Sequence, residues 1–457
     1  MDPLELGPQS SPAEPATQLK KWILGWAGLG MIILIGLGCS VYLAYDYIRD
    51  SIQSIPLTSS FLSDKTPLNQ IAFAGNDGNI WLVTPSGEDL RPVTTDQRGY
   101  RFPTWAPDSR HLAFVGPDAV EEISALYITA IGELEPKVVF KEPNSTPFYL
   151  YWAPNSTHLT FLTQEISGLT MRLVDLNQPG FTRTIGEGAP FYWVWSPNDH
   201  YLLMHVGGSA AFSEEAHLSL IETRQGAERQ QLEWRPGQFQ APVWSRDGNY
   251  FFYIAIDEDG KEAIYKSDVE TLQSERVTDL GGFALMVLSP SDQYMAYLQF
   301  EPGARVPFGK AYLVDTAGQE QTPLADFLIA SIYWSPDGKK LALLGLTWGQ
   351  EGPTAKMGGL AAPLALETQL RWWIYDVEAE TLEPLVSFTP TTAFLQTVPF
   401  FDQYHLSLTF WSPDSRYFVV TKKNKEDEHG SVWVYDTTGQ KEAHRVGNGD
   451  FAVWSWR

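Results

Sequence analysis

The most regular feature of the sequence is a pair of apolar segments separated by a short polar turn. The first segment ends in Trp, and the turn carries Pro together with Asp, Asn or Gly. In the clearest copy, Ser335-Pro336-Asp337-Gly338, Pro presets φ for a tight turn and Asp and Gly suit the positions after it. The pattern predicts a β-hairpin in every copy. Seven full copies begin at Pro103, Leu150, Trp193, Pro242, Met286, Ile332 and Thr409, and a truncated one begins at Ala452.

Each hairpin is followed by a third strand of aromatic and β-branched residues and by a weaker fourth strand. Examples of the third strand are Ile80–Val83 and Val432–Tyr435. Most successive Trp positions lie 43 to 49 residues apart, a period typical of a four-stranded antiparallel propeller blade. A single blade cannot bury both of its faces, so the units are expected to stack around an axis.

The two ends of the repeat region complement each other. Asn69–Thr95 contains the second, third and fourth strands of a unit, and Phe451–Arg457 contains only the Trp strand. Joined, they form one blade that closes the ring. The sequence therefore predicts an all-β, eight-bladed propeller, with a seven-bladed ring as the alternative. The polar residues at the repeated turn position are interpreted as turn formers and not as metal ligands: Asp108, Asn155, Asn198, Asp247, Asp337 and Asp414.

The Trp-Ser-Pro-Asp-Gly turn before an apolar strand resembles the repeats of TolB-like and wider WD-repeat-like propellers. The resemblance covers roughly Asn69–Arg457, with Leu288 in place of Trp and Arg246 in place of Pro in individual copies. It implies a propeller that binds proteins or peptides. The motif residues are structural in that family, so the resemblance transfers no activity.

An apolar segment near the N-terminus predicts a membrane anchor. Trp22–Tyr45 has no charged residue, and as a helix of 24 residues it would be about 36 Å long, enough to span a bilayer. Lys20 and Lys21 precede it, so we expect a single-pass protein with a cytoplasmic N-terminus and an extracytoplasmic propeller, in the periplasm or at the cell surface. The expected parts are a tail (1–21), the helix (22–45), a stalk (46–67) and the propeller (68–457). A cleaved signal peptide and a lipid on Cys39 stay open as alternatives.

Charge and cysteine content exclude several classes of function. The net charge of −23 and the absence of a basic stripe argue against nucleic-acid binding, which needs clustered Lys and Arg. The one cysteine, Cys39, lies inside the apolar segment, so intrachain disulfides, Cys-based zinc sites and covalent haem attachment are excluded.

No linear catalytic motif is present. The chain lacks Gly-x-Ser-x-Gly and His-Glu-x-x-His, and the acidic run Asp257–Gly260 fits a hairpin turn better than a calcium loop. We therefore expect no catalytic residue, no cofactor, no metal and no enzymatic activity. The alternative is a hydrolase or lyase with a site at the axial funnel, built from acids and histidines of different blades.

Two segments are longer than the repeat requires. Trp334 and Trp411 are 77 residues apart, because of an insertion at 347–369 and an excess segment at 388–405. Long loops on a rigid scaffold often carry binding residues, so we expect a membrane-anchored module that binds a protein partner or joins a membrane complex. Packing onto their own blade, or contact with the bilayer, is the alternative for these segments. The candidate partner-binding residues are Trp348, Met357, Leu360, Leu364, Phe394, Leu395, Phe400, Phe401 and Tyr404.

Overall fold

The computed structural model describes residues 69–457 except 122, 134, 179, 189, 212, 224–228, 233, 302–307, 319–320, 347–368 and 425–428. The predicted tail, membrane helix and stalk lie outside the described residues. Within the part that is described, no helix is both long enough and apolar enough to cross a bilayer.

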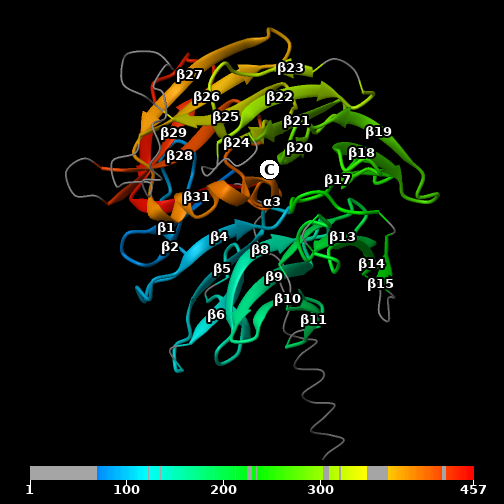
Figure 1. Ribbon diagram of the computed structural model, residues 1–457. Coiled ribbons are helices and arrows are strands. Elements are labelled where there is room, and N and C mark those ends of the chain that lie inside the picture. The colour runs from blue at the N-terminus through cyan, green and yellow to red at the C-terminus, as the bar shows by residue number, and fades with distance from the viewer. Residues whose placement is uncertain are drawn as a thin grey trace, which may run out of the picture. The chain divides into compact units, whose positions relative to one another are not determined.

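Eight antiparallel sheets surround a central axis (Figure 1), which confirms the predicted all-β, eight-bladed propeller. Seven sheets have four strands in the order expected for blades. In blade eight, β28, β29 and β30 form the sheet, and Trp411 bridges to Phe418 in place of an inner strand.

The strands are grouped by their position within a blade. The inner strands of blades one to seven are β31 (Gly449–Trp454), β4 (Arg101–Trp105), β8 (Thr146–Trp152), β12 (Phe191–Trp195), β16 (Val243–Trp244), β20 (Ala284–Leu288) and β24 (Ile329–Trp334). The second strands are β1 (Ile71–Gly75), β5 (His111–Pro117), β9 (His158–Glu165), β13 (Tyr201–Val206), β17 (Tyr250–Ile256), β21 (Tyr294–Gln299), β25 (Lys340–Leu346) and β28 (Tyr417–Lys423). The third strands are β2 (Ile80–Val83), β6 (Ser124–Ala130), β10 (Gly168–Asp175), β14 (His217–Glu222), β18 (Glu262–Asp268), β22 (Lys310–Asp315), β26 (Leu370–Asp376) and β29 (Gly430–Asp436). The outer strands are β3 (Arg91–Pro92), β7 (Lys137–Lys141), β11 (Thr182–Glu187), β15 (Arg229–Gln231), β19 (Ser274–Asp279), β23 (Gln321–Pro323), β27 (Thr381–Phe388) and β30 (His444–Gly447).

Blade one closes the ring by pairing the two ends of the described chain. β31 pairs antiparallel with β1, with Ile71 opposite Trp454 and Phe73 opposite Ala452. The side chain of Trp454 is fully buried. This pairing confirms the predicted closure and makes the last residues part of the core.

The recurring Trp has a structural reason. The indole of Trp152 in blade three donates a hydrogen bond of 3.1 Å to the carbonyl of Thr104, in the inner strand of blade two. Each such bond satisfies a buried N–H and joins two neighbouring blades. The same bond to the preceding blade is made by Trp105, Trp244, Trp334 and Trp411.

The hairpin turns between first and second strands define one face of the ring, here called the turn face. In the turn after β24, Ser335 donates to the carboxylate of Asp337 (2.6 Å) and accepts from the backbone of Lys340 (2.9 Å). Turns also join one another, since the backbone N–H of Asp337 donates to the hydroxyl of Ser415 (3.0 Å). These Asp side chains therefore serve the turns, as the repeat predicts.

The opposite face carries the connections between second and third strands and those between blades. Because strands in a blade alternate in direction, the end of β25, the start of β26 and the end of β27 all lie on this face. The two ends of the described chain lie at the turn face instead, where the N–H of Arg457 donates to Ser109 (2.9 Å). The opposite face is thus free of both described ends of the chain.

Candidate functional site

A short helical segment closes the centre of the ring. After β27 the chain forms α2 (Thr392–Leu395), the 3-10 helix η1 (Val398–Phe400) and α3 (Phe401–Tyr404) before it reaches blade eight. We call residues 391–408 the plug, and the face that carries it the plug face. In Figure 1 the plug, in orange, lies at the centre of the ring, where α3 contacts β12, β20 and β24 of three different blades.

Local sequence explains these short helices. Thr391 caps α2 by accepting a hydrogen bond from the backbone N–H of Phe394, and its hydroxyl donates to the carbonyl of Asp450 in β31 (2.5 Å). Pro399 lies in the first turn of η1, where its missing N–H has no consequence. The Thr391 cap fixes where α2 begins, and contacts with blades distant in sequence hold the plug in place.

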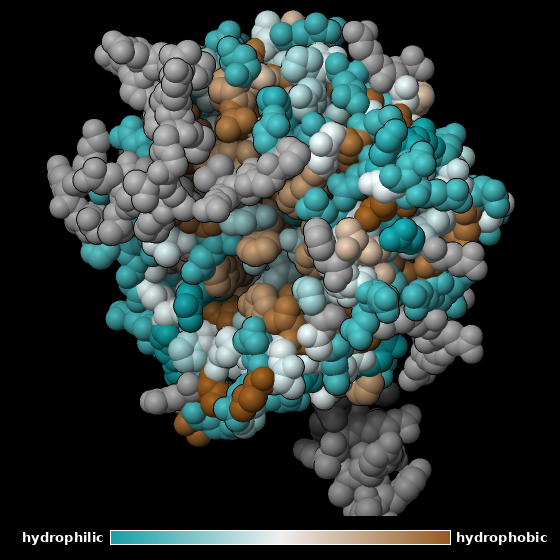
Figure 2. Space-filling model, in the orientation of Figure 1, coloured by the Kyte–Doolittle hydropathy of each residue, from teal (hydrophilic) through white to brown (hydrophobic). Residues whose placement is uncertain are grey.

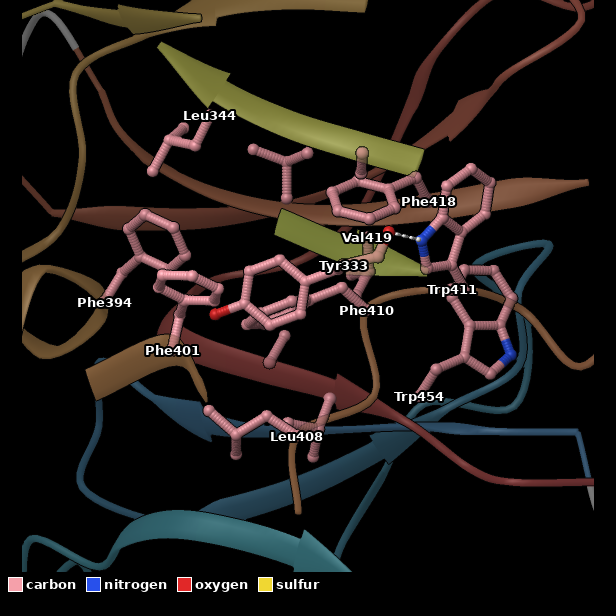
Figure 3. Close-up of a cluster of buried hydrophobic side chains, with 14 of the residues drawn as sticks. Tyr333, Leu344, Phe394, Phe401, Leu408, Phe410, Trp411, Phe418, Val419 and Trp454 are labelled. Atoms are coloured by element: carbon pink, nitrogen blue, oxygen red, sulfur yellow. Dashed lines mark hydrogen bonds between the residues drawn. The ribbon is translucent and has the colours of Figure 1, made fainter. Parts of the chain in front are cut away.

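Several predicted partner-binding residues belong to the plug, and most of them pack inward. Phe394 and Phe401 are buried (Figure 3), and Leu395 and Tyr404 are partly buried. Phe400 is 47% exposed. Trp348, Met357, Leu360 and Leu364 lie outside the described residues. Of the predicted set, Phe400 offers the most accessible apolar side chain in the described structure.

Gln403 fastens α3 to the blades. Its side-chain oxygen accepts from the N–H of Trp193 (2.9 Å), and its side-chain nitrogen donates to the carbonyl of the same residue (2.8 Å). The hydroxyl of Tyr149 donates to the Gln403 carbonyl (2.9 Å) and also contacts the Gln403 amide. One side chain therefore joins the plug to β8 and β12.

Asp402 is a fully buried carboxyl beside Gln403. Its Oδ2 atom accepts from the N–H of Ala241 (2.8 Å), and its Oδ1 atom has no hydrogen-bond partner. Burial raises the pKa of Asp402 to about 7. A carboxyl that titrates near neutral pH at the centre of a fold is a candidate functional group.

Aromatic rings cluster beside the plug. Tyr192 stacks on Phe239 with 4.2 Å between centroids, and Tyr404 meets Tyr149 edge-on at 4.8 Å. Burial, together with the nearby Asp402 carboxylate, raises the pKa of Tyr192 and of Tyr333. Figure 2 shows brown hydrophobic groups in the hollowed centre of this face.

The sequence contained a weak signal for this site. Asp402, Gln403 and His405 are polar residues within an otherwise apolar segment, and none of them was among the predicted site residues. Burial in the fold determines the chemistry of these side chains, and burial cannot be read from the sequence. No group of three or more His, Cys, Asp or Glu side chains able to hold a metal occurs in the described part of the chain.

Two open cavities lie away from the axis. One of about 550 Å³ lies between blades one and two, with Arg98, Tyr100 and Tyr127 in its wall. The other, of about 400 Å³, lies between blades one and eight beside Trp81 and Arg445. Both have walls of mixed charge and polarity, and neither gathers a catalytic constellation.

No protein-family model matches this chain, and no curated protein matches it in sequence. Solved structures do resemble its fold. Dihydro-heme d1 dehydrogenase NirN is 11% identical, with 86% of this chain and 75% of that chain covered and a TM-score of 0.53. An oligogalacturonate lyase in complex with manganese is 16% identical, with 79% and 87% covered and a TM-score of 0.46. A putative TolB from Agrobacterium tumefaciens is 18% identical, with 59% and 95% covered and a TM-score of 0.38.

The dehydrogenase neighbour contradicts the prediction that the protein is not an enzyme. The fold that this chain shares with a dehydrogenase is found in enzymes, so the absence of linear hydrolase and metalloprotease motifs does not exclude catalysis. The physical reason is that a propeller can assemble a site from single residues of different blades, which leaves no linear motif. TolB structures are thus among the proteins whose fold this chain resembles.

Proposed function

We propose that this protein is a membrane-anchored, extracytoplasmic propeller that docks a protein partner through its plug face. The observation that carries the proposal is a set of large hydrophobic side chains exposed on the loops of that face. They come from different blades and from the plug, and they are Val120, Ile166, Leu328 and Phe400. Leu90, Phe181 and Trp456 are exposed at the turn face, but the two most exposed of these side chains, Ile166 (93%) and Val120 (84%), lie on the plug face in neighbouring blades.

Two further features support docking at this face. Both described ends of the chain lie at the turn face, so they do not obstruct the plug face. The segment 388–405, which interrupts an otherwise regular repeat, also lies on this face. The anchor and the extracytoplasmic location are inferred from Trp22–Tyr45 and the lysines before it.

Site-specific crosslinking tests the docking proposal. A photoreactive residue at position 400 should crosslink the full-length chain, in its native membrane, to one partner in stoichiometric amounts. The matched control carries the same residue at Leu90, a 50% exposed side chain on the turn face, and should give little of that product. Equal crosslinking from both positions, or none from position 400, would contradict the proposal.

The anchor is tested separately. The full-length chain should stay with the membrane after alkaline extraction, and the propeller should be digested by protease added outside the cytoplasm. Release by alkali, or protection of the propeller from that protease, would contradict this part without affecting the docking face.

A further inference from the structure

The centre of the ring contains buried polar groups that lack partners. Besides Asp402 Oδ1, both side-chain amide atoms of Gln240 and the hydroxyl of Tyr333 are buried without a hydrogen bond. Gln240 directly precedes Ala241, the residue whose N–H reaches Asp402. In Figure 3 the hydroxyl of Tyr333 points toward Phe401 of α3. Buried polar groups usually have partners, and the Tyr333 hydroxyl lies close enough to Asp402 for that carboxylate to raise its pKa. Asp402 Oδ1 and the Tyr333 hydroxyl therefore form a pair of unsatisfied groups below α3 that a ligand can complete.

The Asp402 carboxylate is not balanced by a positively charged side chain in the described structure. The titratable side chains whose pKa the Asp402 carboxylate affects are the phenols of Tyr192 from β12 and Tyr333 from β24. His405, at the end of α3, donates from Nδ1 to the carbonyl of Phe401. Burial lowers the pKa of His405 to about 4, so this imidazole is neutral at pH 7. None of the ion pairs formed by described Lys and Arg side chains includes Asp402. A cation is therefore the complementary partner for the ionised carboxyl.

The surrounding rings favour an ammonium group over a metal ion. Tyr192, Phe239 and Tyr404 are partly exposed at the plug face, and aromatic faces attract ammonium groups strongly when the site is poorly solvated. A divalent metal would need more oxygen or nitrogen ligands than one carboxylate, and the described residues supply no such cluster.

We propose that the ring axis below α3 binds the ammonium group of a cationic amine, held by the Asp402 carboxylate and the tyrosine rings around it. The proposal does not depend on the docking partner. The amine can be a free small molecule or a lysine side chain of a docked protein, because the recognised chemistry is the same. Since Oδ1 is buried, the single turn of α3 must move outward for the amine to enter.

Binding of n-butylammonium to the full-length, detergent-solubilised protein tests the proposal, with 1-butanol as the neutral analogue at matched ionic strength. We expect n-butylammonium to bind and raise the melting temperature, and 1-butanol to have no effect. Asp402→Asn should weaken n-butylammonium binding at least tenfold. Asp292→Asn, at a partly buried carboxyl of the turn face, should bind like the wild type.

The wild type supplies a second readout in case Asp402→Asn does not fold. Since the amine binds the ionised carboxyl, its affinity should rise about tenfold per pH unit as the pH approaches 7 from below. Equal effects of n-butylammonium and 1-butanol, unchanged binding by a folded Asp402→Asn protein, or an affinity that is flat between pH 5 and pH 7 would each overturn the proposal.

A capped tripeptide, acetyl-Gly-Lys-Gly-amide, distinguishes the two sources of the amine, with its Nε-acetylated form as control. Binding of the lysine peptide, lost on acetylation, supports a protein-borne lysine. Binding of n-butylammonium alone supports a free amine. Failure of both probes overturns the ammonium site and leaves the docking proposal, which is measured by crosslinking, unaffected.

Discussion

The turn face and the plug face of this propeller are built in different ways. On the turn face, polar side chains bond within their own turn, as when Ser335 bonds Asp337 and Lys340, or bond the turn of a neighbouring blade, as when Asp337 bonds Ser415. On the plug face, Gln403 bonds Trp193, which is 210 residues earlier in the chain. The turn contacts recur from blade to blade, whereas the contacts of Gln403 occur once. The recurring turn contacts therefore form the scaffold, and the contacts that occur once, such as those of Gln403, distinguish this molecule.

The two faces also differ in how completely their polar groups are paired. The turn-face carboxylates accept bonds from backbone N–H groups and hydroxyls. In contrast, one oxygen of Asp402, the hydroxyl of Tyr333 and the amide of Gln240 are buried without partners. Leaving a buried polar group unpaired costs stability, so the unpaired oxygen of Asp402 at the plug is a candidate for a functional role.

The largest effect should come from removing the strand on which both faces depend. Deletion of residues 449–457 removes β31, its pairing with β1 and the buried Trp454. Truncation of a buried Trp alone costs about 3–5 kcal/mol, so the deletion should abolish cooperative thermal unfolding as followed by circular dichroism. Removal of Arg457 alone is the control. A deletion variant that melts like the wild type would contradict ring closure.

The next largest effect is a dependence of stability on pH that arises from the buried carboxyl of the plug. The folded pKa of Asp402, about 7, lies above its unfolded value of 3.8. Protonation thus favours the folded state, and this contribution is complete below about pH 4 and is lost as the pH rises through 7. Between pH 5 and pH 8 the loss is on the order of 3 kcal/mol. Asp402→Asn should remove it, measured as the urea-unfolding free energy of wild type minus variant at each pH.

The variant's unfolding free energy is subtracted from that of the wild type because two buried histidines change the stability with pH in the opposite direction. Burial lowers the pKa of His205 and His405 to about 4, from 6.5. Their contribution is lost as the pH falls from 6.5 toward 4, and it is common to both proteins. A pH-independent difference between wild type and Asp402→Asn would contradict the buried carboxyl.

Gln403→Ala should loosen the plug without opening the ring. The substitution removes the side-chain bonds to Trp193 and Tyr149 and leaves buried groups unpaired, which should cost about 2–4 kcal/mol of unfolding free energy. Hydrogen exchange should rise in residues 391–408 more than in the blades. Gln396→Ala, on an exposed residue of the same segment, should leave both quantities unchanged.

The smallest effect is expected on the turn face. Asp337→Ala removes the carboxylate that accepts from Ser335 and from the N–H of Lys339, and should cost about 1 kcal/mol in chemical denaturation. The seven other blades keep their own turns, so the ring should stay closed. A loss as large as that of Gln403→Ala would show that the turn face is less modular than its repeats indicate.

Much of the fold follows from the sequence because propeller chemistry is local and periodic. The Trp-turn-strand unit specified its own hairpin, and the matching half-units at Asn69–Thr95 and Phe451–Arg457 specified the closure. Local patterns did not predict α2, η1 and α3, which span only three or four residues each and are held by distant blades. The missing motifs also led to the wrong expectation about enzymatic activity, because a site assembled across blades has no linear signature.

The sequence by itself determined the strands, their turns and the number of blades, since each of these depends on neighbours within one repeat. Only the tertiary structure decided that residues 391–408 cross the centre of the ring and that Asp402 is buried there. The pKa of that carboxyl depends on desolvation by several blades and on an N–H from Ala241, 161 residues away. Burial and long-range pairing arise only when the ring is closed, so they cannot be predicted from any short segment of the sequence.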